Sequence, residues 1–194
     1  MEERNNLFPV FLKLENLETL IVGGGHVGLE KISGLLKNSP SARITLIARH
    51  IQDDIKTLAK KHSTVKLIER NFRLWDVWHK DIIILATDDR RLHEHIREFT
   101  RAKNILINVA DTPDLCDFYL GSVVTKGNLK IGISTNGKSP TIAKRMREYF
   151  EESLPEDTNV LLDNMQKIRD QIKGDFSEKV KVLNEVTASF LKGQ

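Results

Sequence analysis

The stretch Glu18-Thr-Leu-Ile-Val-Gly-Gly-Gly-His-Val-Gly28, followed by a helical pattern over 29–37, decides the fold of this chain. It predicts a β-strand, a glycine turn and a helix in direct succession. Gly23 allows the sharp turn, Gly25 lets backbone approach a pyrophosphate, and Gly28 lets the helix pack close to the strand. We therefore expect a dinucleotide at this turn.

Two other residues of the turn, His26 and Val27, are also cofactor-binding candidates. They stand where the helix begins, and the unpaired N–H groups of a helix N-terminus attract an anion such as phosphate. From the residues alone, one alternative is that the turn is a glycine-rich connection that binds no ligand. A separate alternative for His26 is that its side chain points to solvent.

The composition narrows the class of protein. A chain of 194 residues accommodates one full-sized core and a small appendage. A net charge of +3 is too small to indicate a nucleic-acid-binding protein, and no apolar run reaches the length of a membrane span. The single cysteine, Cys116, excludes an intrachain disulfide, and we interpret it as a small buried hydrophobe. With no secretory signal in the sequence, we expect a cytoplasmic protein, and with six scattered histidines we expect no permanent metal site.

Strand and helix patterns alternate from the glycine turn to Val109. Further strands are predicted over 42–48, 65–68, 81–86 and 105–109, and helices over 51–61 and 90–101. The run at 81–86 is continuously apolar, which is typical of a strand buried on both faces. The pattern predicts an α/β fold of the Rossmann type, with a doubly wound parallel sheet.

The carboxyl ends of such strands form the ligand crevice of this class of fold. Thr87 and Asp88 follow the fourth predicted strand, so a hydroxyl and a carboxylate are expected to face the cofactor there. The alternative is that Thr87 or Asp88 is only the N-cap of the next helix. Trp75 and Trp78, in the connection before this strand, are interpreted as packing residues.

The alternation stops after Asp111. Two strand-like runs, 118–125 and 129–135, are separated by a turn sequence and predict a hairpin, and Ser139 with Pro140 predicts the start of a helix. Two more amphipathic patterns follow from residue 156. We divide the chain into a nucleotide-binding domain over 1–112, a hairpin-plus-helix segment over 113–152 and a small helical C-terminal domain over 153–194.

Four short motifs together resemble one family. They are Phe8-Pro-Val-Phe11 before the glycine turn, Asn108-Val-Ala-Asp111, Cys116-Asp-Phe118 and Ile133-Ser-Thr-Asn-Gly-Lys-Ser-Pro140. In this order and spacing they resemble the precorrin-2 dehydrogenase of sirohaem biosynthesis, the stand-alone relative of the N-terminal half of sirohaem synthase. The resemblance covers nearly the whole chain.

This resemblance implies an activity and an assembly. The expected reaction is the NAD-dependent oxidation of precorrin-2 to sirohydrochlorin, a conjugated tetrapyrrole that can take iron. Some relatives also insert the iron, so ferrous iron is a candidate second substrate. The family builds a homodimer through its middle segment, which makes 113–152 a dimerisation segment by resemblance.

Asp111 is the candidate catalytic residue. It follows the last parallel strand and matches the functional aspartate of the family. A carboxylate there would accept the proton that leaves the substrate during oxidation. The alternative is that Asp111 only organises the Asp-Thr-Pro turn through its side chain.

The substrate-binding candidates lie between the hairpin and the next helix. Thr135 matches a family position at the tetrapyrrole end of the site, and Asn136 and Gly137 would let backbone approach the substrate; the alternative is an ordinary turn before the Ser139 cap. Precorrin-2 carries many carboxylates, which suits a basic cluster. The candidates for binding these carboxylates are Lys138, Lys144 and Arg147, with a solvated helix face as the alternative.

Arg49 departs from the usual pattern of an NAD site. NAD-specific Rossmann domains place an acid about 20 residues beyond the glycines, where it binds the ribose hydroxyls, and this chain has Ala48 and Arg49 there. Arg49 is therefore a candidate contact for adenine or for a 2′-phosphate. The resemblance favours NAD as the cofactor.

Two other functions remain open from the sequence. One is a chelatase that inserts iron or cobalt without oxidising the substrate. The other is a non-catalytic, dinucleotide-sensing module whose C-terminal helices bind another protein. Indifference to tetrapyrrole distinguishes the second from an enzyme.

Overall fold

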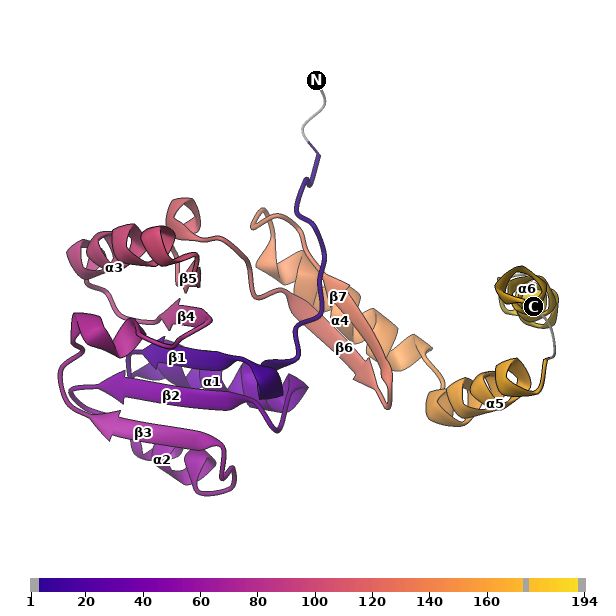
Figure 1. The fold of residues 1–194 in the computed structure, drawn as a ribbon, viewed down its shortest axis with the longest axis horizontal. Helices are drawn as coiled ribbons and strands as arrows, with labels where there is room; N and C mark the ends of the chain where they lie inside the picture. Colours follow the sequence, from indigo (N-terminus) through magenta and orange to yellow (C-terminus); the bar gives the residue numbers. More distant parts are fainter. Residues whose placement is uncertain (1–3, 173–174, 192–194) are drawn as a thin grey trace. The chain divides into compact units, whose positions relative to one another are not determined.

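A computed structural model describes residues 4–172 and 175–191. The chain divides into two compact units, with the boundary between Gly121 and Ser122. Figure 1 draws both units along the chain. The three-part division made from the sequence stays a prediction. In the described residues, no helix is long and apolar enough to cross a membrane.

The first unit is built on a five-stranded parallel sheet with strand order β3-β2-β1-β4-β5. Its strands are β1 (Glu18–Val22), β2 (Arg43–Ala48), β3 (Val65–Glu69), β4 (Ile82–Leu85) and β5 (Leu106–Val109). Its helices are α1 (His26–Asn38), α2 (Asp53–Ala59) and α3 (Arg90–Lys103), with short 3-10 helices η1 (Leu14–Asn16), η2 (Leu74–Val77) and η3 (Pro113–Leu115). The predicted Rossmann-type sheet is confirmed.

Side chains that alternate along the strands form a core on each face of the sheet. In β4, Ile82 and Ile84 pack into the cluster under α1 and α2, whereas Ile83 and Leu85 pack into the cluster that includes Val77 of η2 and Ile96 of α3. All four strand residues are at most 2% exposed. The continuous apolar run thus follows from burial on both faces. Figure 1 shows α1 and α2 on one face of the sheet and α3 above its β4 and β5 edge.

The tryptophans near η2 were predicted to be packing residues, and this prediction is wrong. Trp75 is 61% exposed and Trp78 is 62% exposed. The short 3-10 turn directs only Val77 into the core, so that its neighbours are left at the surface. The Arg73 guanidinium carbon lies 5.2 Å from the centre of the Trp75 ring, a cation–π contact.

The second unit begins with the predicted hairpin, which is confirmed. Strands β6 (Ser122–Lys126) and β7 (Leu129–Ile133) pair in antiparallel fashion, and α4 (Pro140–Ser153) packs against both. Ser139 caps α4 by accepting a hydrogen bond from the Ile142 N–H at 3.2 Å. The last helices are α5 (Thr158–Gln171) and α6 (Phe176–Leu191).

Candidate functional site

The glycine turn connects β1 to α1 through backbone contacts that admit no side chain at three positions, Gly23, Gly24 and Gly28. Gly23 has a φ of +124°, and a β-carbon on it would lie 2.2 Å from the Ala86 carbonyl oxygen. A β-carbon on Gly28 would lie 2.2 Å from the Gly23 carbonyl oxygen. At Gly25, by contrast, nothing lies within 4 Å of the β-carbon position. The turn is therefore tightly packed on its inner side and open at Gly25, where a ligand would approach.

Helix α1 begins at this open position. Gly25 is its N-cap and has no side chain to satisfy the first N–H groups, and the first intrahelical bond runs from the Leu29 N–H to the Gly25 carbonyl at 2.9 Å. The N–H groups of His26, Val27 and Gly28 are thus the free donors of the helix start. His26 is exposed and Val27 is half-buried. Three free donors at a helix N-terminus fit a pyrophosphate.

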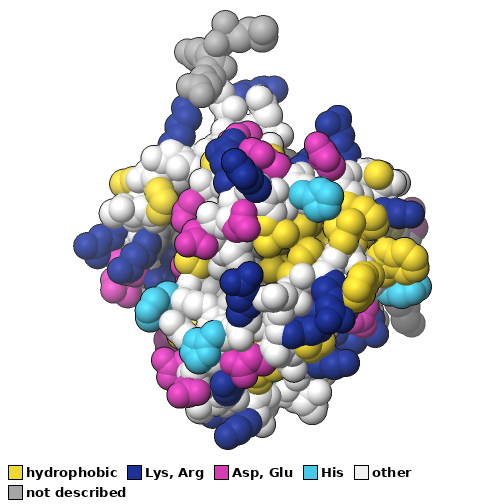
Figure 2. Space-filling model, turned by 90° about the vertical axis from the view of Figure 1, so that its left-hand side faces the viewer, with side chains coloured by type: hydrophobic (Ala, Val, Ile, Leu, Met, Phe, Trp, Pro, Cys, Tyr) yellow, Lys and Arg dark blue, Asp and Glu magenta, His cyan; other side chains and the backbone are white. Residues whose placement is uncertain are grey.

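Figure 2 views the molecule from the end toward which the arrows of β1, β2 and β3 point in Figure 1. The carboxyl ends of the parallel strands lie at this end. Hydrophobic side chains gather in one part of this view, and Lys, Arg, His, Asp and Glu side chains lie around them.

Thr87 follows β4 and is held by a buried histidine. Its Oγ1 lies 2.8 Å from Nε2 of His93, which is 3% exposed on α3. Burial lowers the pKa of His93, against the opposing charges of Asp89 and Asp88, so the imidazole is neutral at neutral pH. The N-cap of α3 is Asp89, which accepts from the Leu92 N–H, and therefore neither Thr87 nor Asp88 has the capping role considered from the sequence.

Arg49 follows β2 and forms a hydrogen bond with a residue beyond β3. Its Nε donates to Oδ1 of Asn71 at 2.5 Å. In the glycine turn, the Gly24 carbonyl accepts from the Gln52 N–H, three residues beyond Arg49, at 3.0 Å. The segment after β2 thus lies directly against the predicted cofactor turn.

Asp111 lies just beyond the carboxyl end of β5 in an unusual backbone conformation. Its φ is +55°, in the left-handed region that few residues other than glycine adopt. The side chain is exposed, and no hydrogen bond or ion pair to it occurs in the described part of the chain. The turn is closed instead by Thr112. Its N–H donates to the Val109 carbonyl at 3.3 Å, and its hydroxyl donates to the Ala110 carbonyl at 3.2 Å. The carboxylate is thus available for chemistry, and the turn does not depend on it.

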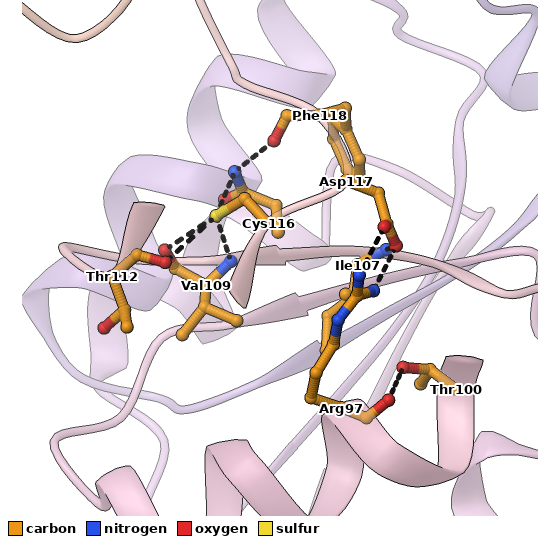
Figure 3. A network of polar contacts seen from close by, with 9 residues as sticks. Arg97, Thr100, Ile107, Val109, Thr112, Cys116, Asp117 and Phe118 are labelled. Atoms are coloured by element: carbon orange, nitrogen blue, oxygen red, sulfur yellow. Dashed lines mark hydrogen bonds and ion pairs between the residues drawn. The ribbon is translucent and has the colours of Figure 1, made fainter. Parts of the chain in front are cut away.

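The loop that carries Asp111 is held against β5 by Cys116. Its Sγ accepts from the Val109 N–H at 3.2 Å and lies 3.3 Å from the Val109 carbonyl and 3.4 Å from the Thr112 carbonyl (Figure 3). The side chain is half-buried and packs against the core cluster that includes Val109, so the interpretation of Cys116 as a small buried hydrophobe is correct only in part. Burial raises the pKa of its thiol, which keeps it protonated and able to donate. The thiol acts as a polar bridge between the loop and β5.

An ion pair completes this attachment. Both Nη groups of Arg97 donate to the Asp117 carboxylate, at 2.5 Å and 2.7 Å (Figure 3). Asp117 also accepts from the Ile107 N–H at 3.1 Å, and the Asp117 N–H donates to the Ile107 carbonyl at 2.8 Å. Hydrogen bonding by Arg97 lowers the pKa of Asp117. The edge strand β5 is therefore covered, and the loop between Val109 and Asp117 is fixed at both ends.

The substrate-binding candidates lie in the second unit. Thr135 Oγ1 donates to the Ser139 carbonyl at 3.1 Å and accepts from the Ser139 N–H at 3.2 Å. Asn136 and Gly137 have φ values of +53° and +75°, and nothing lies within 4 Å of a β-carbon placed on Gly137. The turn before α4 is therefore built by Thr135, and its tip has open space at Gly137.

The basic candidates lie at the turn and along α4. Lys138 follows the turn, and its N–H donates to the Thr135 carbonyl at 3.0 Å. Lys144 and Arg147 lie 3.8 Å from glutamates one turn further along α4, Glu148 and Glu151. The Lys144 side chain is 64% exposed, and an ion pair of this length is weak there, so this side chain is able to turn to another anion at small cost. The Arg147 side chain is only 30% exposed, and its Nε is buried without a hydrogen-bond partner among the described residues.

The sequence-predicted residues fall into one group in each unit. The first unit brings the glycine turn, Arg49, Thr87, Asp88 and Asp111 to the carboxyl edge of one sheet. The second unit brings the Thr135 turn to the N-terminus of α4. Among the described residues, no three His, Cys, Asp or Glu side chains are grouped as metal ligands. The sequence pattern indicated no site role for Asn71, His93 or Arg97, and Asn108 and Asp117 appeared in it only as members of family motifs.

Comparison with known proteins places the chain in a family. Residues 10–122 match a family of NAD(P)-binding domains, and residues 126–153 match the central segment of sirohaem biosynthesis proteins. The chain belongs to this family of NAD(P)-binding domains, and the central segment of sirohaem biosynthesis proteins follows the domain. The suspected family is thus confirmed, and the first unit is an NAD(P)-binding domain.

Named relatives agree with this assignment. The chain is 38% identical over 180 residues to a siroheme synthase of Psychrobacter arcticus, covering 92% of this chain and 31% of the relative. It is 33% identical over 172 residues to the siroheme synthase of Ruthia magnifica, and the match covers 89% of this chain and 36% of the relative. The chain thus spans about a third of the length of the curated relatives it matches.

A solved structure shares the fold. The precorrin-2 dehydrogenase SirC superposes with a TM-score of 0.71 at 22% sequence identity, over 93% of this chain and 89% of SirC. The arrangement of a parallel sheet, a hairpin and C-terminal helices is therefore common to both chains.

Proposed function

We propose that this chain oxidises precorrin-2 to sirohydrochlorin with NAD as the hydride acceptor. The observation that carries the proposal is Asp111: an exposed, unpaired carboxylate in a left-handed conformation, on the same sheet edge as the glycine turn. Uncommon backbone conformations of this kind gather at active sites. Relatives named siroheme synthase and precorrin-2 dehydrogenase support the choice of substrate.

The cofactor site has the features that a dinucleotide requires. The open face of Gly25 and the free N–H groups at the start of α1 would hold the pyrophosphate. Thr87, fixed by neutral His93, would present its hydroxyl beside the turn, since Ala86 packs on Gly23. When bound, the nicotinamide supplies the acceptor for a hydride. The chain itself would bind the cofactor and orient it.

Asp111 would move the proton. Oxidation of the tetrapyrrole removes a hydride and a proton, and a carboxylate within reach of the substrate accepts the proton as a general base. The attachment of its loop by Cys116 and Asp117 would keep the carboxylate in place while substrate binds. Positioning of this kind is a large part of what an active site contributes.

The second unit would bind the acidic substrate. Asn136 and Gly137 form a turn tip with open space, which allows close backbone approach. Lys138, Lys144 and Arg147 would pair with the substrate carboxylates. Insertion of ferrous iron into the product remains part of this proposal, with the iron bound by the tetrapyrrole as a substrate.

An absorbance assay tests the reaction. Purified chain mixed with precorrin-2 should form sirohydrochlorin when NAD is supplied and not in its absence. If no precorrin-2 is converted with NAD at any pH, the proposal is wrong. Iron insertion into supplied sirohydrochlorin without any NAD-dependent oxidation would instead identify a chelatase, and indifference to both tetrapyrroles would identify a sensing module.

We also propose a homodimer formed through the hairpin and α4. A two-stranded sheet is marginally stable by itself. On α4, Ile142 is 54% exposed, Met146 is 40% exposed and Tyr149 is 60% exposed, which leaves an apolar surface available for a second copy. Light scattering should give twice the chain mass of 22.2 kDa, whereas a single-chain mass at micromolar concentration would contradict the homodimer.

A further inference from the structure

The segment that follows β2 borders the predicted cofactor turn. The Gly23 N–H donates to the Ile47 carbonyl at 3.0 Å, and a β-carbon on Gly24 would lie 2.4 Å from the His50 carbonyl oxygen. Arg49 stands between these two contact points in the chain. In Rossmann domains the residue at the end of the second strand faces the adenosine ribose of a bound dinucleotide. Its side chain therefore decides which ribose is accepted.

An acid at this position binds the ribose hydroxyls of NAD and repels the 2′-phosphate of NADP. Here the neighbouring acid, Glu69 at the end of β3, is occupied by other groups. It accepts from the Ile51 N–H at 2.9 Å and lies 3.3 Å from Lys56 and 3.5 Å from His50. The Ile51 hydrogen bond is the main cause that lowers the pKa of Glu69. Its negative charge is thus compensated within the segment and α2.

Arg49 is oriented by the bond from its Nε to Asn71. The side chain is exposed, and its two Nη groups make no hydrogen bond or ion pair with the residues that the structure describes. A guanidinium held through Nε presents its Nη groups as a fixed pair of donors, which matches the oxygens of a phosphate.

We propose that Arg49, oriented by Asn71, binds the 2′-phosphate of NADP, so that this chain accepts NADP as well as NAD. The inference rests on the cofactor site of the proposed function. It is independent of the tetrapyrrole chemistry, since it concerns only the adenosine end of the dinucleotide.

Calorimetric titration of the full chain with NAD and with NADP, without substrate, tests the proposal. NADP should bind at least as tightly as NAD. Arg49→Gln should weaken NADP binding about tenfold, as expected for the loss of one charge-assisted phosphate contact, and change NAD binding by less than about twofold. Arg49→Lys should recover only part of the loss, because an ammonium lacks the paired donors.

A matched control lies on the same strand. Arg43 begins β2 at the opposite end of the sheet, where it pairs with Glu18 at 3.2 Å, and Arg43→Gln removes the same charge without touching the cofactor edge. This variant should bind both dinucleotides as the parent does. The proposal is overturned if the parent chain binds NAD but not NADP, or if Arg49→Gln loses the same amount of affinity for both dinucleotides. Either result leaves the proposed function unaffected. Failure of both dinucleotides to bind the parent chain overturns the cofactor site itself.

Discussion

Replacing Asp111 by asparagine is expected to reduce the rate of precorrin-2 oxidation about 100-fold or more, the range typical of a lost general base. Asparagine is nearly the same size and tolerates the left-handed region as well as aspartate does, so the φ of +55° is kept. Only the basic carboxylate is removed. Binding of NAD and the melting temperature should therefore stay close to those of the parent chain.

The control for this variant is Asp114→Asn in the same loop. Asp114 lies in η3, and its side chain is 73% exposed. Its carboxylate lies 3.8 Å from the Arg90 guanidinium, and an exposed ion pair of this length contributes little to stability. Activity should be retained. Full activity of Asp111→Asn would contradict the catalytic role, and a large loss of melting temperature would show that the aspartate is structural.

The second large effect is expected at the glycine turn, where two substitutions separate folding from binding. In Gly28→Ala the new β-carbon would lie 2.2 Å from the Gly23 carbonyl oxygen and 3.0 Å from its carbon, so α1 has to shift. Overpacking against backbone costs about 1–3 kcal/mol of folding free energy. In Gly25→Ala the β-carbon enters open space at an ordinary φ of −90°, so folding is preserved. The methyl group then occupies the approach to the pyrophosphate, and NAD binding should weaken at least about tenfold.

Gly34 supplies the matched control within α1. Nothing lies within 4 Å of its β-carbon position, and it is an interior helix residue. Gly34→Ala should stabilise the fold, raising the free energy of unfolding by about 0.5–1 kcal/mol through backbone entropy, and leave NAD binding unchanged. Thermal melts and calorimetric titration of the three variants check this. Unchanged NAD affinity in Gly25→Ala would rule out the turn as the pyrophosphate site.

Much of the fold was predictable because periodic burial leaves a periodic sequence. The apolar run of β4 indicated a strand buried on both faces, and the glycine spacing indicated the turn. The buried face of α3 also has a signal in the sequence, since His93, Ile96 and Thr100 are spaced for one helical face. His93 was therefore recognisable as a core residue.

Other features left no such signal. The pair of Arg97 and Asp117 joins residues 20 positions apart, and the bond from Arg49 to Asn71 joins residues 22 apart. Such pairs depend on which loops the fold brings together, and a single sequence does not encode that in any local pattern. The exposure of Trp75 and the bridging role of the Cys116 thiol were not predicted, for the same reason: residue type alone indicated burial, whereas the local turn geometry determines the surroundings of each side chain.

The most direct test of the central claim is the stoichiometry of the reaction. Precorrin-2 and NAD are incubated with the purified chain, and the absorbance of NADH and of sirohydrochlorin is followed together, with Asp111→Asn in parallel. We predict one NADH for each sirohydrochlorin formed, and a slow rate of both in the variant. Sirohydrochlorin that forms without matching NADH, or no reaction at all, would contradict the account.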